Sequence, residues 1–155
     1  CMFAIHLVNA NKSIDDLVKT KTARNAHFIV IAPEYVCYPR FVQYAFLQAF
    51  KTFETGRQTA KTLNLEWLAK LAMTKNVSNA VNFTKPSGNQ ICLASVNCFE
   101  KSVQIAEIGK ELQIGNEFRQ KAEKILAEKY SVSAKALGVY KLEDLLIEKA
   151  AVENL

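Results

Sequence analysis

The segment RFVQYAFLQAFKTFE, residues 40–54, constrains the fold most, because it has a helical pattern with apolar residues around most of its circumference. A surface helix needs only one apolar stripe, so a helix of this kind is expected at the centre of a core. Gly56 follows and can end the helix by adopting a left-handed backbone. The other segments of the 155-residue chain must cover this helix, and that length suits one domain with a substantial core.

Short β-rich runs and capped helical patterns surround this central helix. Strands are expected at residues 2–8, 27–32 and 90–96, with a further candidate at 111–115. Helices are expected at residues 13–21, 40–54, 62–72, 77–83, 98–110, 116–130 and 141–152, with possible caps at Ser13, Asn76, Asn97 and Asn116. Pro33 and Pro39 bracket a turn. This order predicts an α/β fold, a single-domain sandwich over residues 1–155 of a small mixed, mainly antiparallel β-sheet with packed helices.

The excess of positive over negative charge is confined to the first half of the chain. Residues 1–75 hold ten Lys or Arg and five Asp or Glu, whereas residues 76–155 hold ten of each. Between Tyr35 and Lys75, six cations face two acids. Such a surface suits a phosphate-bearing partner, although a solvated helix face would have the same composition.

The sequence offers little that indicates catalysis. It lacks the glycine-rich phosphate loops, the H-x-x-x-H pair and the G-x-S-x-G elbow. Its two histidines, His6 and His27, lie in strand-like apolar runs. Glu66 lies among cations and is four residues before Lys70, the favoured orientation for a helical ion pair, so it indicates a structural pairing more than a general base.

The cysteines and the hydropathy pattern indicate a cytoplasmic protein. Cys1, Cys37, Cys92 and Cys98 form no C-x-x-C pair, and we expect reduced, mostly buried thiols with no metal site and no cofactor. No apolar run reaches the length of a membrane span, so no membrane partner is expected. The first residues, CMFAIHLVN, are apolar but short and lack a basic leader, so they favour a strand over a signal peptide.

Binding is therefore the more plausible role for the segment between residues 50 and 81. Arg57, Lys61, Lys70 and Lys75 can neutralise phosphates, and Asn76 caps a helix whose free N–H groups favour an anion. Apolar side chains lie between these cations and could support unpaired bases, although the same spacing is typical of core residues: Trp67, Leu71, Met73 and Val77.

The succession TGRQTAKTL, EWLAKLA and NVSNAV, followed by the closing YKLEDLLIEKAAV, resembles the small accessory subunit of the KEOPS tRNA-modification complex, the family of the PRPK-binding protein TPRKB. The order of elements agrees over nearly the whole chain. The matching residues are Gly56, Arg57, Lys61, Thr62, Glu66, Lys70, Asn76, Val77, Ala80 and Val81. Two positions depart from the family, which often has Ser-Gly at Ala72–Met73 and Gly at Lys85.

The resemblance implies a non-catalytic subunit. KEOPS forms threonylcarbamoyl-adenosine at position 37 of tRNA, and its accessory subunit binds and supports a small kinase-like ATPase and helps to recruit the tRNA 3′ CCA end. The catalytic subunit would be an indirect partner. The tRNA-binding residues would be Arg57, Lys61, Lys70, Lys75 and Asn76. On the last helix, more apolar residues occur than one stripe needs, and those expected to bind the kinase are Leu142, Leu145, Leu146 and Ala150.

Two alternatives remain open at the level of the sequence. The first is a kinase-binding adaptor that does not bind RNA, which the departure at Ala72–Met73 favours. The second is a small enzyme with a cysteine nucleophile, either Cys37 or Cys98.

Overall fold

The computed structural model describes residues 2–11, 27–97 and 109–154. The helix predicted at residues 13–21 lies outside this part of the chain. All but the last two residues of the helix predicted at 98–110 lie outside it as well.

The described strands form one four-stranded sheet in the order β2-β3-β1-β4. Its strands are β1 (Met2–Ala10), β2 (His27–Ile31), β3 (Gln90–Asn97) and β4 (Gly109–Glu111). Every pairing among these strands is antiparallel, so the prediction of a mainly antiparallel sheet is confirmed. The candidate strand at 111–115 was misplaced, because β4 ends at Glu111. Gly109 allows β4 to approach β1, since a Cβ there would lie 2.0 Å from the Asn9 carbonyl oxygen.

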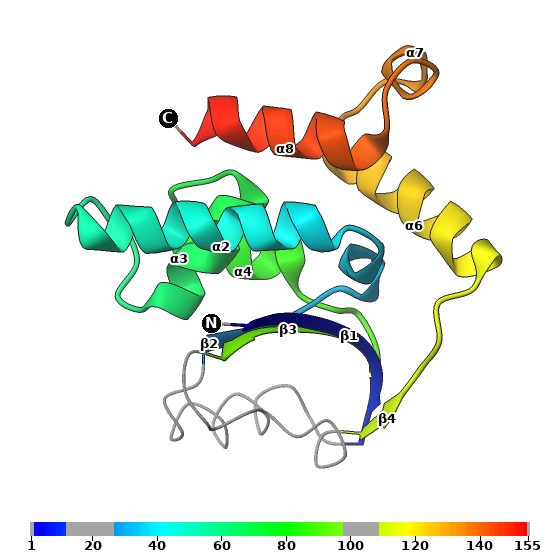
Figure 1. The fold of residues 1–155 in the computed structure, drawn as a ribbon, viewed down its shortest axis with the longest axis horizontal. Helices are drawn as coiled ribbons and strands as arrows, with labels where there is room; N and C mark the ends of the chain where they lie inside the picture. The colour runs from blue at the N-terminus through cyan, green and yellow to red at the C-terminus, as the bar shows by residue number, and fades with distance from the viewer. Residues whose placement is uncertain (1, 12–26, 98–108, 155) are drawn as a thin grey trace.

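The helices gather on one face of this sheet (Figure 1). They are η1 (Pro33–Cys37), α2 (Pro39–Glu54), α3 (Leu63–Ala72), α4 (Val77–Thr84), α6 (Asn116–Lys129), α7 (Ala134–Leu137) and α8 (Leu142–Glu153). The five longer ones agree with the predicted helices within two residues at each end. Asn76 caps α4 as predicted, with its side chain accepting a hydrogen bond from the Asn79 amide at 3.0 Å. The cap predicted at Asn116 was wrong, because Gly115 precedes α6 and Asn116 is its first residue.

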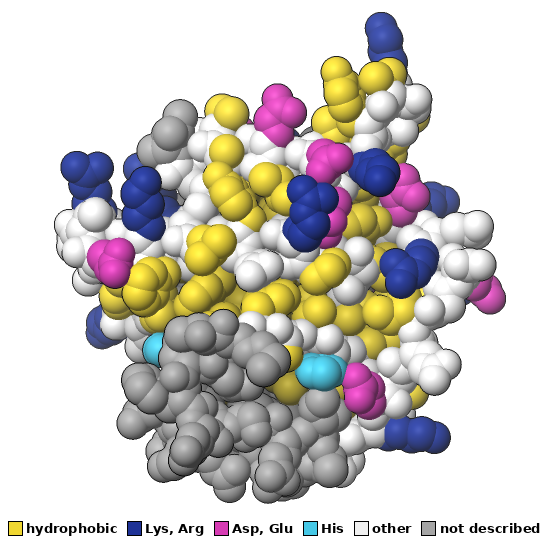
Figure 2. All heavy atoms as spheres, viewed as in Figure 1, with side chains coloured by type: hydrophobic (Ala, Val, Ile, Leu, Met, Phe, Trp, Pro, Cys, Tyr) yellow, Lys and Arg dark blue, Asp and Glu magenta, His cyan; other side chains and the backbone are white. Residues whose placement is uncertain are grey.

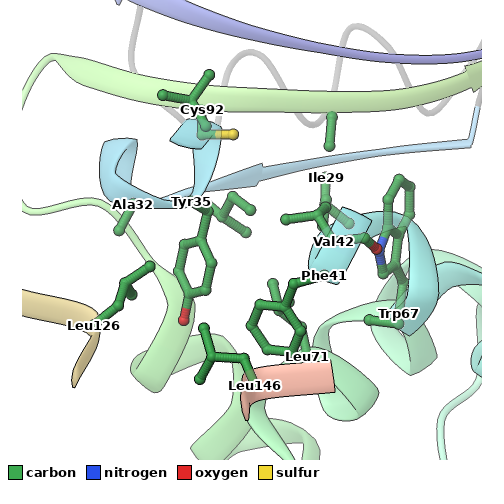
Figure 3. Close-up of a cluster of buried hydrophobic side chains, with 14 of the residues drawn as sticks. Ile29, Ala32, Tyr35, Phe41, Val42, Trp67, Leu71, Cys92, Leu126 and Leu146 are labelled. Carbon is green, nitrogen blue, oxygen red and sulfur yellow. The ribbon is translucent and has the colours of Figure 1, made fainter. Parts of the chain in front are cut away.

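Aromatic and aliphatic side chains from the sheet and from α2, α3, α6 and α8 form the main core (Figure 3). Trp67 donates a hydrogen bond from Nε1 to the Val42 carbonyl at 3.0 Å, so its one polar atom is satisfied. The Tyr35 and Tyr130 hydroxyls lie 2.8 Å apart, and Tyr130 donates to the Leu71 carbonyl at 2.7 Å. The prediction that α2 lies centrally in the core is confirmed, because Phe41, Val42, Ala45 and Ala49 are fully buried.

Candidate functional site

The turn between α2 and α3 carries the first two predicted RNA-binding residues. We call residues 55–62 the basic loop. It begins where Gly56 adopts φ +69°, a left-handed conformation that glycine tolerates best, and where the Arg57 amide donates to the Thr52 carbonyl at 3.0 Å. It ends at Thr62, whose hydroxyl accepts a hydrogen bond from the Leu65 amide at 3.2 Å and caps α3. Both ends of the loop are therefore held by their own local hydrogen bonds.

The middle of the basic loop is held by a carboxylate from the first turn of α3. Glu66 Oε2 accepts hydrogen bonds from the Thr59 amide at 3.1 Å, the Thr59 hydroxyl at 3.3 Å and the Ala60 amide at 2.9 Å. Its other oxygen lies 3.8 Å from Lys70 Nζ, so the predicted ion pair is confirmed. The side chain of Glu66 is only 1 % exposed and that of Lys70 15 %. Glu66 thus connects the basic loop to the core.

The four predicted cations are not equivalent in the structure. Arg57 and Lys61 are exposed on the basic loop, and Lys75 is exposed between α3 and α4. Lys75 lies beyond the far end of α3, a ten-residue helix and therefore about 15 Å long. Figure 2 shows Lys and Arg side chains at the left edge of the molecule, beside the C-terminal end of α2. Of the four predicted cations, two are therefore exposed together on the basic loop, while the charge of Lys70 is directed at Glu66.

The apolar surface expected between these cations is only partly present. Trp67 and Leu71 are fully buried in the core, so the expectation that they could support unpaired bases was wrong. Their spacing along α3 places them on the side that packs against α2. Met73 and Val77 are partly exposed and remain on the surface near Asn76.

The two departures from the family pattern fit the local backbone. Met73 has φ 58° at the end of α3, the left-handed conformation that a glycine would adopt there. Lys85 has φ −65° and ψ 147°, an extended conformation open to any residue and favoured before Pro86. Met73 therefore takes a backbone conformation that glycine adopts more easily, and Lys85 takes one that strains no residue.

Most of the residues predicted to bind a kinase pack into the core. Leu142, Leu146 and Ala150 recur every four residues on α8, and all three are buried. Leu145 is partly exposed. In the free protein, Leu145 is therefore the only one of the four predicted residues that a partner could reach without unfolding α8.

α8 lies alongside α2 and runs in the same direction (Figure 1). At one end, Arg40 lies 3.6 Å from Glu143 and 3.4 Å from Asp144. Near the other end, the Gln48 amide donates to the Ala150 carbonyl at 3.4 Å. These contacts fix the two helices against each other along most of their length.

Large apolar side chains remain exposed on this pair of helices. Leu47 and Phe50 of α2 are 55 % and 45 % exposed, and Val152 of α8 is 62 % exposed. We call these three residues the α2–α8 apolar face, and Figure 2 shows hydrophobic side chains over both helices. Leu47 and Phe50 are not among the residues that the sequence predicts as binding candidates. The signal was present, because a helix that is apolar around most of its circumference can leave one apolar side in solvent.

The candidate catalytic residues lack the features of a reactive site. Burial raises the pKa of the Cys37 and Cys92 thiols, which disfavours the nucleophilic thiolate. His6 Nδ1 lies 2.7 Å from Glu111 across β1 and β4, an exposed pairing between strands. Cys98 lies outside the described residues. In the described ranges, no group of three or more His, Cys, Asp or Glu is placed to hold a metal ion.

None of the described helices has the length and apolar character that crossing a bilayer requires.

A family model described as "Kinase binding protein CGI-121" matches residues 6–154 of the chain. No curated protein matches the sequence. The match includes all residues of the basic loop, of α3 and of the α2–α8 apolar face.

Proposed function

The chain belongs to the CGI-121 family of kinase-binding proteins, and from that premise we propose that it binds a small kinase-like ATPase through the α2–α8 apolar face. The observation that carries this proposal is the exposure of Leu47, Phe50 and Val152 on two helices that are fixed against each other. Exposed large apolar side chains on a rigid pair of helices are typical of the central part of a protein interface. Leu145 remains in the proposal as a further contact on α8.

The proposed role is support of the kinase and not catalysis by this chain. Burial raises the pKa of the Cys37 thiol, which argues against that cysteine as a nucleophile, while the other candidate, Cys98, lies outside the described residues. The KEOPS accessory subunit would act in this way, by holding the kinase-like ATPase near the catalytic subunit in the cytoplasm. The product of the whole KEOPS complex would be threonylcarbamoyl-adenosine at position 37 of tRNA.

The second part of the proposal is that the basic loop binds the 3′ CCA end of tRNA. Arg57 and Lys61 are exposed on a loop that is fixed at its beginning, its middle and its end. A fixed backbone loses little conformational entropy on binding, and exposed cations carried on it can follow the phosphates of an unpaired strand. Lys75 and Asn76 would extend the site toward the start of α4.

One observation favours the alternative of an adaptor that binds the kinase without RNA. Lys70 faces Glu66 and is largely buried, so it contributes less positive charge to the surface than the sequence suggests. An RNA site would then depend on the charges of Arg57, Lys61 and Lys75. The departure at Ala72–Met73 also favours this alternative, although Met73 has the left-handed backbone that a glycine would adopt.

Two measurements on the purified protein test the proposal. The first is co-purification with a small kinase from cells that express the tagged chain, followed by titration with the isolated kinase. The second is a filter-binding titration with tRNA that carries or lacks its CCA end. Binding to both supports the full proposal, whereas binding to the kinase alone supports the adaptor. A chain that binds no kinase would overturn the first part of the proposal.

A further inference from the structure

A buried carboxylate supports the basic loop, and its hydrogen-bond partners come from that loop. Glu66 lies in the first turn of α3 on the side that faces the core, where an ionised carboxylate loses its contact with water. Burying such a charge is costly unless hydrogen bonds or an opposite charge compensate it. Here three hydrogen bonds and one ammonium group do so. The side chain of Glu66 therefore holds neighbouring groups of the chain in place.

The partners of Glu66 show what that function is. Two of the three hydrogen bonds come from backbone amides, those of Thr59 and Ala60, at 3.1 and 2.9 Å. These amides belong to no helix or strand, so the carboxylate replaces the backbone partner that regular structure would supply. Among the described residues, Glu66 is the only side chain that accepts hydrogen bonds from the segment 58–61.

The geometry of these bonds fixes the backbone on which the two exposed cations of the loop are carried. Ala60 immediately precedes Lys61, and Thr59 follows Arg57 by two residues, so the anchored amides lie between the two cations. The Ala60 residue itself is buried. With its centre held on α3 and its ends held by Gly56 and Thr62, the loop keeps the backbone positions of Arg57 and Lys61 in one arrangement.

Lys70 completes this arrangement from the next turn of α3. Its Nζ lies 3.8 Å from the carboxylate oxygen that the loop does not use. The pairing compensates the charge of Glu66 without using Arg57 or Lys61. Within the described residues, neither loop cation is paired with an acidic side chain, so both can meet an anion from solution.

We propose that Glu66 is the positioning residue of an RNA site, which holds the Thr59–Ala60 backbone so that Arg57 and Lys61 meet successive phosphates of an unpaired RNA 3′ end. This inference rests on the proposed tRNA function and assigns Glu66 a part in it. Glu66 itself touches no RNA, because it is enclosed by the loop and by Lys70. Its effect on binding is transmitted through the backbone of the loop.

Two substitutions at Glu66 separate positioning from charge. Glu66→Gln keeps a side-chain oxygen that can accept from the Thr59 and Ala60 amides, whereas Glu66→Ala removes every hydrogen bond to the loop. The matched control is Thr84→Ala on α4, which also removes a buried polar side chain, one that donates to the Ala80 carbonyl at 2.8 Å. The probe is a short single-stranded RNA that ends in CCA, at a temperature where all four proteins are folded.

The expected results are specific to the loop. Glu66→Ala weakens RNA binding by about tenfold or more, because misplaced contacts lose much of their contribution. Glu66→Gln keeps binding within about threefold of the wild type, and Thr84→Ala leaves it unchanged. Amide hydrogen exchange, which a purely global loss of stability would accelerate everywhere, increases in Glu66→Ala first at Thr59 and Ala60.

Two other outcomes contradict the inference in different ways. If the wild type binds RNA and the folded Glu66→Ala variant binds it equally well, Glu66 is a structural residue only and the RNA site stands without it. If the wild type binds no RNA, the proposed tRNA function fails, and the role of Glu66 in it fails with it.

Discussion

The side-chain amide of Asn154 donates a hydrogen bond to the backbone carbonyl of Lys70 at 3.1 Å, across 84 residues of sequence. The same amide donates to the side-chain oxygen of Gln48 at 3.1 Å. The end of α8 is thus connected to α2, which carries the α2–α8 apolar face, and to α3, which anchors the basic loop. The two proposed binding sites are built on the same three helices.

Removing the charge of the basic loop should weaken RNA binding and reduce its salt dependence. In the double variant Arg57→Ala/Lys61→Ala, the slope of log K against log salt concentration should fall by about 1.4, because each contact with a single-strand phosphate contributes about 0.7. The measurement is a filter-binding titration at several salt concentrations. The control is Lys121→Ala/Lys124→Ala on α6, which removes the same charge from two exposed lysines elsewhere. Equal losses in both double variants would mean that only net charge matters.

A charge on the α2–α8 apolar face should abolish kinase binding and leave the fold intact. Leu47→Glu and Val152→Glu are each expected to cost about 2–5 kcal/mol of binding free energy, because a carboxylate would be desolvated in the interface. The melting temperature should change by less than about 3 °C, since both side chains are already largely in water. Isothermal titration with the kinase and thermal unfolding give the two values. Ile125→Glu, an exposed apolar position on α6, should bind normally.

Neighbouring leucines on α8 should respond in opposite ways to the same substitution. Leu146→Glu should prevent folding, because the side chain is fully buried and a carboxylate there would have no partner. Leu145→Glu should fold, because Leu145 is partly exposed, and it should lose part of its affinity for the kinase. Circular dichroism and a kinase pull-down on both variants check this. A folded Leu145→Glu protein with full affinity would remove Leu145 from the interface.

Alkaline pH should destabilise the protein through its buried tyrosines. Burial raises the pKa of Tyr35 and of Tyr130 above that of a free tyrosine. In the unfolded chain the phenols ionise near pH 10, roughly. The contribution of the neutral, buried phenols to the free energy of unfolding is therefore complete below that pH and decreases as the pH rises above it. Urea unfolding between about pH 8 and pH 11 measures the decrease. Tyr35→Phe should make the decrease shallower, whereas Tyr140→Phe, at an exposed position, should not.

The sequence was sufficient to predict the elements whose signals are local. The cap at Asn76, the stop at Gly56 and the Glu66–Lys70 pair all depend on residues within a few positions of one another, and all three occur in the structure. The short helices η1 and α7 were missed, because segments of four or five residues carry too little periodicity to be distinguished from turns.

The solvent exposure of individual apolar side chains could not be predicted from the sequence. The sequence pattern around an apolar residue such as Trp67 or Leu47 does not distinguish a core position from an interface position. The packing of α2 against α3 and α8 decides which of them remains in solvent. The hydrogen bonds from Thr59 and Ala60 to Glu66 were also beyond prediction, since loop amides leave no pattern in the sequence.

The parallel packing of α2 and α8 has a consequence for synthesis on the ribosome. The hydrogen bond between Gln48 and Ala150 joins positions 102 residues apart, so α2 is made long before the helix that covers it. During that interval α3 can cover one side of α2, but the side that will be covered by α8 has no partner from the described part of the chain. Nascent chains in this condition are prone to aggregate. The folding yield of this protein should therefore depend on how soon α8 emerges, and slow translation between α2 and α8 should increase its need for chaperones.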